Sequence, residues 1–375
     1  MFKITFLLSL HVLSFVLRTM RLTWLYGALK LTDAEAATAT VNSVGQQPIW
    51  TATQEYLARV RASIAAATTA FVERQTDRYT DSYKLPGGGR LQRRGPQSQP
   101  GAVKGSGGWD TAYPLEDFGD QVAGDDVTLA YLSVEEYQRA VDTVVIRDVN
   151  TVRFEMLKAL FNPTNATFTD PRGNLTIRRL ANSDGSLYPP VIGSESEADD
   201  THYLESGYAA SAISDTNNPY TTIRAEIEEH FGEGNIVVFI HPDQETKTKD
   251  LTDFTDAPSP FITPGASTAT VTDMPNVPGK VIGRVSGVWV SVWHYIPTGW
   301  MFGLDLNAPA PLIERVDPAF TGLGTGLQLV STDQIYPFTM AFWRHRFGYG
   351  VGNRLNGVAF ELGTGGTYGA PTIYA

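Results

Sequence analysis

The side chains of this chain that could carry chemistry are few and scattered. His241, Pro242 and Asp243 follow the apolar run 235–240, and catalytic groups in α/β folds often lie just after a buried strand. We favour a simple turn at this position. The sequence offers no Gly-x-Ser-x-Gly motif and nowhere assembles a nucleophile, a base and an orienting group. We therefore predict no catalytic residues.

Metal and cofactor sites are also not predicted. His202 and His294 have no partner at metal-ligand spacing, and a zinc site needs three or four ligands. Gly348, Gly350 and Gly352 superficially resemble a phosphate-binding loop, but the lysine and the strand-to-helix context are missing. Two glycosylation sequons, at 165–167 and 174–176, matter only if the chain is secreted.

Composition limits the class of protein further. The 375 residues, 42% of them hydrophobic, are enough for a sizeable core and two or three domains. The absence of cysteine excludes disulfides and thiolate metal sites, and it suits a reducing compartment. A net charge of −11 argues against broad nucleic-acid binding, which needs clustered Lys and Arg.

The N-terminus has two interpretations. The apolar run 4–17 is short for a membrane helix, which needs about 20 residues. It could be a signal peptide, although no convincing cleavage site follows. It could also precede the true start of translation, and we lean to a start at or after Met20.

One long helix is the clearest predicted element. Ser133 and Glu136 form a capping box, and apolar residues then recur at gaps of three and four until Asn162-Pro163. The pattern predicts a helix of roughly 28 residues, about 42 Å long at 1.5 Å per residue. Its other face is charged, and we expect that face either to be solvated or to lie against other chains; its residues are Glu135, Arg139, Asp142, Arg147, Asp148, Arg153 and Lys158.

Upstream of this helix, the sequence predicts a second helix and a long loop. An apolar stripe from Ile49 through Leu57 and Val72 predicts a helix to about Tyr79. The glycine- and proline-rich stretch 85–109 then predicts a long loop that stands out from the body, and such loops are usually functional or disordered. Its charged residues are all basic: Lys84, Arg90, Arg93, Arg94 and Lys104.

Downstream, the pattern becomes rich in short strands. We predict strand-like pieces in 168–192, a helix at 220–231, a buried strand at 235–240, a hairpin from 281–293 to 301–306 and a strand at 313–316. The tail, 340–374, mixes aromatic residues, arginine and glycine. Acidic residues gather in two runs: Glu195, Glu197, Asp199 and Asp200, and Asp117, Asp120, Asp125 and Asp126.

This order of elements resembles the major capsid protein of tailed bacteriophages, whose fold is shared with herpesvirus capsid floors and encapsulins. The match is best at 279–292, with the turn 296–299, and in the arginine-rich aromatic segments 342–348 and 353–357. The resemblance covers about residues 50–375. It implies an α+β capsid-protein fold with these parts: an N-terminal segment, 1–50; an N-terminal arm helix, 51–83; an extended loop, 84–127; a peripheral domain with a spine helix, 128–194; an axial domain, 195–334; and a return to the peripheral domain, 335–375.

The resemblance also implies a function and partners. The chain would be a non-enzymatic structural protein that forms pentamers and hexamers and closes into an icosahedral shell around double-stranded DNA. It would be assembled in the host cytoplasm with a scaffolding protein, a portal and a decoration protein, and without a membrane. The net negative charge suits loose, non-specific contact with packaged DNA. Some members form cross-links through a Lys and an Asn, but nothing in this sequence shows that Lys84 or Lys104 reacts.

We further expect the basic loop to lie on an acidic surface of a neighbouring subunit, with the run from Glu195 to Asp200 as its partner. Two other interpretations stay open. One is an encapsulin-like cargo compartment. The other is a secreted β-rich enzyme or carbohydrate binder, suggested by the apolar N-terminus and by aromatic residues that we expect to be exposed, such as Trp289, Trp293 and Trp300.

Overall fold

The computed structural model describes residues 38–84, 91, 96, 108–123, 131–194, 196–257, 275, 277–317, 326–330 and 340–375. The apolar run 4–17 and Met20 lie outside these residues, as do Arg90, Arg93, Arg94, Lys104 and Glu195. Among the helices of the described residues, none is long and apolar enough to cross a membrane.

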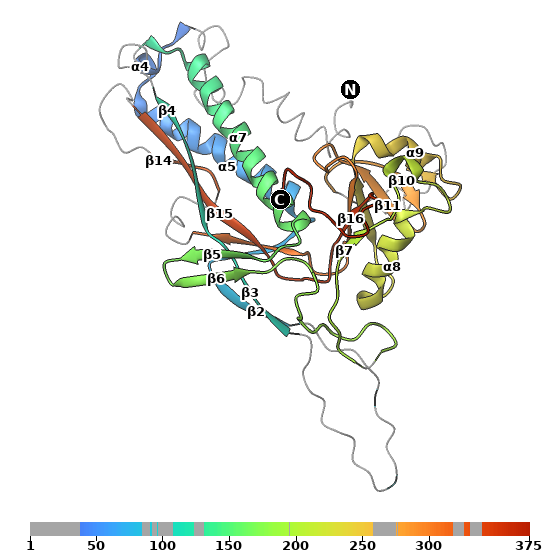
Figure 1. The fold of residues 1–375 in the computed structure, drawn as a ribbon. Helices are drawn as coiled ribbons and strands as arrows, with labels where there is room; N and C mark the ends of the chain where they lie inside the picture. Colours follow the sequence, from blue (N-terminus) through green and yellow to red (C-terminus); the bar gives the residue numbers. More distant parts are fainter. Residues whose placement is uncertain are drawn as a thin grey trace.

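The long helix forms as predicted and is the spine of the molecule (Figure 1). Helix α7 spans Val134–Phe161, 28 residues. The Ser133 hydroxyl accepts from the backbone N–H of Glu136, and the Glu136 carboxylate accepts from the backbone N–H of Ser133, so the capping box is complete. The helix ends at Phe161, because Asn162 before the proline takes an extended conformation.

The N-terminal helix is shorter than predicted. After the short α4, Val41–Val44, helix α5 spans Gln46–Thr68 rather than running to Tyr79. The chain then turns and enters strand β1, Val72–Thr76, which pairs in parallel with β13, Leu312–Val316. Phe71, which lies within the predicted helix range, is instead fully buried at this turn. The backbone groups of 72–76 find partners in a sheet, and this non-local pairing overrides the helical spacing.

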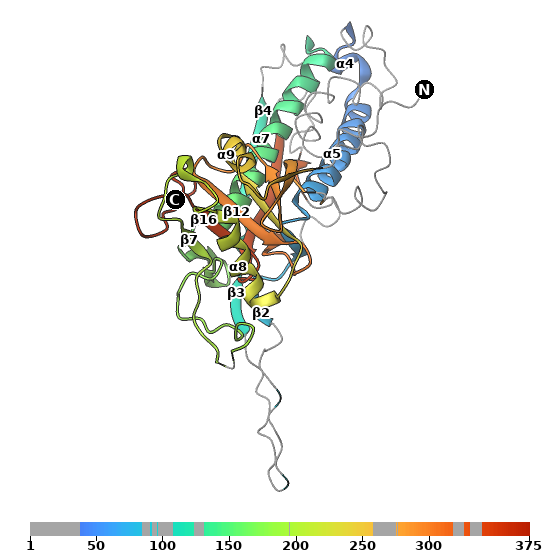
Figure 2. The ribbon, with the colours of Figure 1, turned by 90° about the vertical axis from the view of Figure 1, so that its right-hand side faces the viewer.

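Within the described residues, one sheet of five strands lies under the spine. Its central strand is β15, Met340–Val351, which pairs with β13, with β14, Gln328–Val330, and with β4, Glu116–Ala123. Figure 2 shows α5 beside α7. Both helices bury an apolar face in one core, together with Leu327, Leu329 and Trp343.

A second sheet of seven described strands forms the other body of the molecule. Its strand order is β7 (Tyr203–Glu205), β16 (Val358–Glu361), β12 (Trp300–Asp305), β8 (Ile236–Ile240), β11 (Val288–Val292), β10 (Lys280–Val285) and β9 (Thr255–Asp256). Helix α8, Pro219–Phe231, packs Ile223 and Ile227 onto it. The remaining helical pieces of the described residues are η1, Ala210–Ala212, η2, Pro242–Gln244, and α9, Glu245–Lys249.

The predicted hairpin from 281–293 to 301–306 is wrong. The hairpin is instead β10–β11, which turns at Ser286-Gly287, and β8 lies between β11 and β12. All five residues of β8 are buried, so the backbone N–H and C=O groups at both of its edges need partners, which β11 and β12 supply. The helix α8, strand β8 and strand β13 occur where the sequence predicts them.

Two short ladders complete the fold. Strands β5, Ala166–Asp170, and β6, Gly173–Ile177, form one antiparallel pair, which confirms strand structure in that region. Strands β2, Thr80–Lys84, and β3, Gly108–Ala112, form the other. This second pair closes the stretch between Lys84 and Gly108. Residues 108–123, which were assigned to the extended loop 84–127, instead form β3 and β4, and β4 pairs with β15 in the five-stranded sheet.

The two sheets exchange strands at positions other than the expected domain boundaries. Strands β13 and β14 fall in the expected axial segment 195–334 but belong to the five-stranded sheet. Strand β16 falls in the expected return segment 335–375 but belongs to the seven-stranded sheet. The sheets are also joined by one core, in which the second half of α7 meets β8, β12, β13 and β15.

Candidate intersubunit surface

The base of the extended loop is rigidly held. Lys84, the one predicted loop contact within the described residues, is exposed at the last position of β2 and pairs with Gly108. Behind it, Tyr83 stacks on Trp109 with ring centres 5.6 Å apart. The Trp109 indole N–H donates to the carbonyl of Gly352 (2.9 Å), and the Thr111 hydroxyl donates to that of Val351 (2.7 Å). The chain therefore leaves for the loop from a base fixed to the end of β15.

The acidic segment 196–200 lies near this base. Tyr188 forms an isolated bridge with Ala198, and its ring meets that of Trp109 edge-on at 5.3 Å. Glu197 and Asp199 are exposed. Asp200 is different, because its carboxylate turns inward to His202 and His230. Glu197 and Asp199 are thus the described acids of this run that face solvent.

A buried arginine holds the segment 179–186, whose neighbouring residues bridge to the acidic segment. Arg354 is fully buried and donates to the carbonyls of Arg179 and Leu180. Its other hydrogen bonds reach Asn182, Asp184 and Ser186. Burial alone would raise the pKa of Asp184, but hydrogen bonds from Ser186 and Arg354 hold it well below its usual value.

The described residues of the other acidic run form ion pairs within the chain. Asp117 on β4 pairs with Arg344 on β15, and Asp120 pairs with Arg147 on α7 at 2.6 Å. Asp125 and Asp126 lie outside the described residues.

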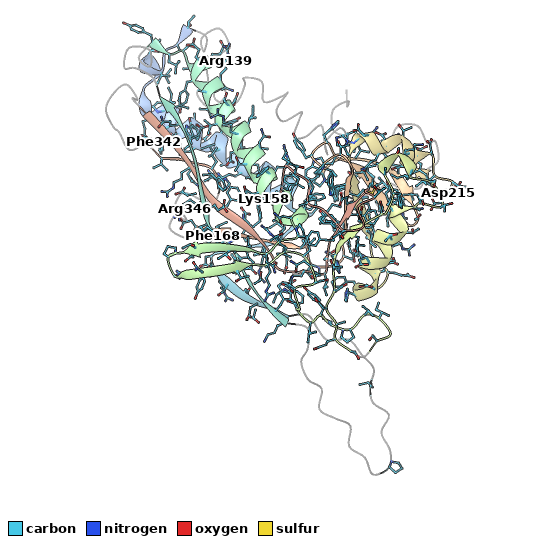
Figure 3. All side chains as sticks on the ribbon, in the orientation of Figure 1. Arg139, Lys158, Phe168, Asp215, Phe342 and Arg346 are labelled. Carbon is cyan, nitrogen blue, oxygen red and sulfur yellow. The ribbon has the colours of Figure 1, made fainter. Side chains whose placement is uncertain are left out.

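The charged face of α7 is only partly solvated. Figure 3 shows Arg139 and Lys158 toward opposite ends of the helix, and Arg139 and Arg147 are exposed. Asp148 is buried and lies 2.6 Å from His345, and the buried Arg153 guanidinium lies 3.5 Å from the centre of the Tyr295 ring. The expectation of one solvated face is therefore wrong for the second half of the helix, where β15 and the second body cover it.

Large apolar side chains remain exposed on two parts of this surface. One part is a residue just before the N-cap of α7 together with the middle of that helix, and the other is the segment that precedes the acids. The residues are Tyr131 and Ile146, and Leu187, Val191 and Ile192. Single exposed apolar residues are ordinary, but groups of them often mark contact with another protein.

The other candidates from the sequence have structural roles. His241 caps the 3₁₀ turn η2 by accepting from the backbone N–H of Asp243, so the prediction of a turn is confirmed. Gly348 and Gly350 lie in β15, where a Cβ atom would come within 2.4 Å and 2.6 Å of the carbonyl oxygens of Pro114 and Ala112. These glycines permit close backbone packing and do not form a phosphate loop.

The aromatic residues cited for a carbohydrate binder are not exposed. Trp289 and Trp293 are buried in the core. Trp300 is half-buried, and its indole N–H donates to Gly369. The structure therefore removes this support for a secreted binder.

We did not predict one cluster of potential metal ligands from the sequence. His202 was expected to lack metal-binding partners, yet the structure brings it together with Asp200, Glu229 and His230. The pairs Asp200/His202 and Glu229/His230 are far apart in the chain, so spacing alone could not connect them.

Comparisons with known proteins come from structure alone. No protein-family model and no curated protein sequence matches this chain. A chain from Mycobacterium phage Patience matches with a TM-score of 0.63 and 17% identity, over 90% of this chain and 94% of that one. The capsid of the native GTA particle (TM-score 0.47, 11% identity, 79% and 90% covered) and a putative prophage capsid protein of E. coli CFT073 (0.45, 10%, 83% and 99%) are more distant. The first match carries the conclusion on fold, and the predicted α+β capsid-protein fold is confirmed.

Proposed function

We propose that this chain, which has the α+β fold of phage capsid proteins, assembles with copies of itself into the icosahedral shell that encloses a double-stranded DNA genome. The observation that carries the proposal is the match to the phage Patience chain, which spans nearly the whole of both chains. The shape agrees, since an elongated spine with α5 and a projecting loop base suits repeated contacts between subunits better than an isolated globule (Figure 1).

In this proposal the chain forms pentamers and hexamers in the host cytoplasm and ends in the virion capsid. A scaffolding protein, a portal and a decoration protein would be its other partners, and the protein would have no enzymatic activity. The net charge of −11 favours weak, non-specific contact with the packaged DNA.

The extended loop is the proposed intersubunit contact. Arg90, Arg93, Arg94 and Lys104, together with Lys84 at the loop base, would lie on the acidic segment of a neighbouring subunit. Glu197 and Asp199 support this because they are exposed and carry the opposite charge. Glu195 and Asp200 complete the proposed acidic run, although Asp200 also has partners in its own chain.

Assembly tests the proposal directly. The chain is expressed with the scaffolding gene that accompanies it, and the product is examined by electron microscopy and sedimentation. We expect closed particles, and gentle dissociation should release pentamers or hexamers. A chain that remains monomeric in all such conditions would contradict the proposal. Particles that hold protein cargo and never DNA would instead indicate an encapsulin-like compartment.

A further inference from the structure

Four side chains with metal-binding atoms converge where the seven-stranded sheet meets the end of α8. Asp200 and His202 alternate on an extended segment that leads into β7, so both can face the same side. Glu229 and His230 lie on the last turn of α8. One ligand atom from each residue lies within 4.8 Å of all the others.

Three distances within the cluster approach those between ligands around one small cation. The Nε2 atoms of His202 and His230 lie 3.2 Å and 3.0 Å from the same oxygen, Oδ2 of Asp200. Oε1 of Glu229 lies 3.3 Å from Nε2 of His230. Zinc bonds of about 2.0–2.1 Å in a tetrahedral shell put neighbouring ligand atoms roughly 3.3 Å apart. The observed spacing therefore already approaches that of ligands around a shared ion.

The orientation of the His202 ring also supports a bound cation. Its side chain is fully buried, and Nδ1 lies 2.9 Å from the carbonyl oxygen of Gly357. A carbonyl can only accept, so Nδ1 carries the hydrogen, and in the neutral ring the lone pair of Nε2 faces the Asp200 carboxylate. Two acceptors in contact in a buried place require a cation, either a proton or a metal ion, between them. A backbone carbonyl that fixes the other ring nitrogen is also the usual support of a metal-bound histidine.

The charge of the cluster favours a divalent ion. Asp200, Glu229 and the adjacent Glu226 place three carboxyl groups around two imidazoles. The site thus stabilises positive charge.

We propose that Asp200, His202, Glu229 and His230 form a structural zinc site. Two imidazoles favour zinc over magnesium or calcium, which prefer all-oxygen shells, and four protein ligands are typical of structural zinc. The ion would fasten the segment that carries the exposed acids to α8. All four ligands belong to one chain, so the inference holds whether or not the chain builds a shell.

Zinc binding by the purified full-length chain is the test. After treatment with a chelator, the protein is titrated with Zn²⁺ in competition with a chromophoric chelator, and Co²⁺ is used as a spectroscopic probe. We expect about one ion per chain, a visible Co²⁺ absorption typical of tetrahedral coordination, and a higher melting temperature with zinc. His230→Gln should raise the zinc Kd by roughly 100-fold or more, because it removes a ligand outright.

His294→Gln is the matched control, because His294 is exposed and lies outside the cluster. This variant should bind zinc like the parent. Glu229→Gln, at a half-buried position, provides a second ligand variant if His230→Gln does not fold by circular dichroism. A parent chain that does not bind zinc, or ligand variants that bind it as tightly as His294→Gln, would overturn the proposal.

Discussion

At the residue scale, Arg354 shows how one buried charge can organise a loop. Its guanidinium donates hydrogen bonds to the carbonyls of Arg179 and Leu180, which are shielded from water, and also to the carboxylate of Asp184. A buried charge is costly unless its donors are used, and here several acceptors surround it. The segment from Arg178 to Ser186 is therefore held by a residue of the C-terminal tail, more than 160 positions away in sequence.

We predict that Arg354→Met destabilises the unassembled chain by about 3 kcal/mol at neutral pH, because buried acceptors lose their partner. The pKa of Asp184 is lower in the folded chain, so its stabilising effect is present above its unfolded pKa of about 4 and is lost as the pH falls below it. The variant should therefore lose less stability on acidification than the parent. Urea denaturation at several pH values measures both effects.

Arg178→Met is the matched control for this prediction. Arg178 also pairs with Asp184, at 2.7 Å, but its side chain is more exposed. Its loss should cost less than about 1 kcal/mol. Equal destabilisation by the two substitutions would show that the burial of Arg354 gives it no special role.

Some residue roles could be predicted from the sequence and others could not. The Ser133/Glu136 capping box is local, because both partners lie within one turn, and it was predicted correctly. Asp148 and Arg153 were placed on a charged face, but their partners, His345 and Tyr295, come from distant parts of the chain. Spacing along a helix identifies a face but does not show what covers it.

At the element scale, the start of α7 also fastens the N-terminal arm. Thr40 bridges Ser133, the Val41 N–H donates to the carbonyl of Leu132, and the Val134 N–H donates to that of Ala39. The N-cap of α7 and the segment that leads into α5 are therefore joined by backbone hydrogen bonds. This arrangement explains why α4 and α5 lie along the first half of the spine (Figure 2).

Ser133→Ala should destabilise the unassembled chain by about 1 kcal/mol, because it removes the N-cap acceptor of α7. The matched control is Thr143→Ala, on the exposed face of the same helix, where the hydroxyl donates only to the carbonyl of Arg139. The control should stay within about 0.5 kcal/mol of the parent. Chemical denaturation followed by circular dichroism compares them, and a control as damaging as Ser133→Ala would refute the capping role.

The sequence predicted most elements but not how they pair. The spacing that defines α7 and α8 and the buried run of β8 are local signals. The neighbours of β8 are not, because β11 and β12 pair with it across long stretches of chain. The same limit explains β1, whose residues follow a helical spacing until a parallel partner, β13, is known.

At the scale of the whole molecule, the two sheets form one mechanical unit. Phe71 follows the arm helix, and its ring centre lies 5.1 Å from that of Phe239 and 5.7 Å from that of Trp293. Both of these partners belong to the seven-stranded body. Phe161, at the end of the spine, meets Phe302 at 5.8 Å. The arm and the spine are therefore packed against both sheets. Such a continuous core suits a subunit that neighbouring subunits contact on several sides.

The extended loop leaves this unit at Lys84 and returns at Gly108, close to the acidic segment of its own chain. Arg93 and Arg94 could thus pair within the chain or, as we propose, with Glu197 and Asp199 of a neighbour. The double substitution Arg93→Glu/Arg94→Glu distinguishes these arrangements. An exposed pair contributes about 0.2–1 kcal/mol, so the effect on one subunit is small, but it repeats at every contact of the shell.

We expect the double variant to leave the denaturation of the unassembled chain unchanged and to lower the temperature and salt concentration at which assembled shells dissociate. Arg93→Gln/Arg94→Gln is the matched control, because it removes the attraction without adding repulsion, and its shells should lie between the parent and the charge-reversed variant. Added salt should reduce the differences in shell stability among the three proteins, because it screens exposed charges; the Debye length is about 8 Å at physiological ionic strength. A loss of stability in the unassembled chain would indicate an intrachain contact, and shells identical to the parent would show that the basic residues face only water.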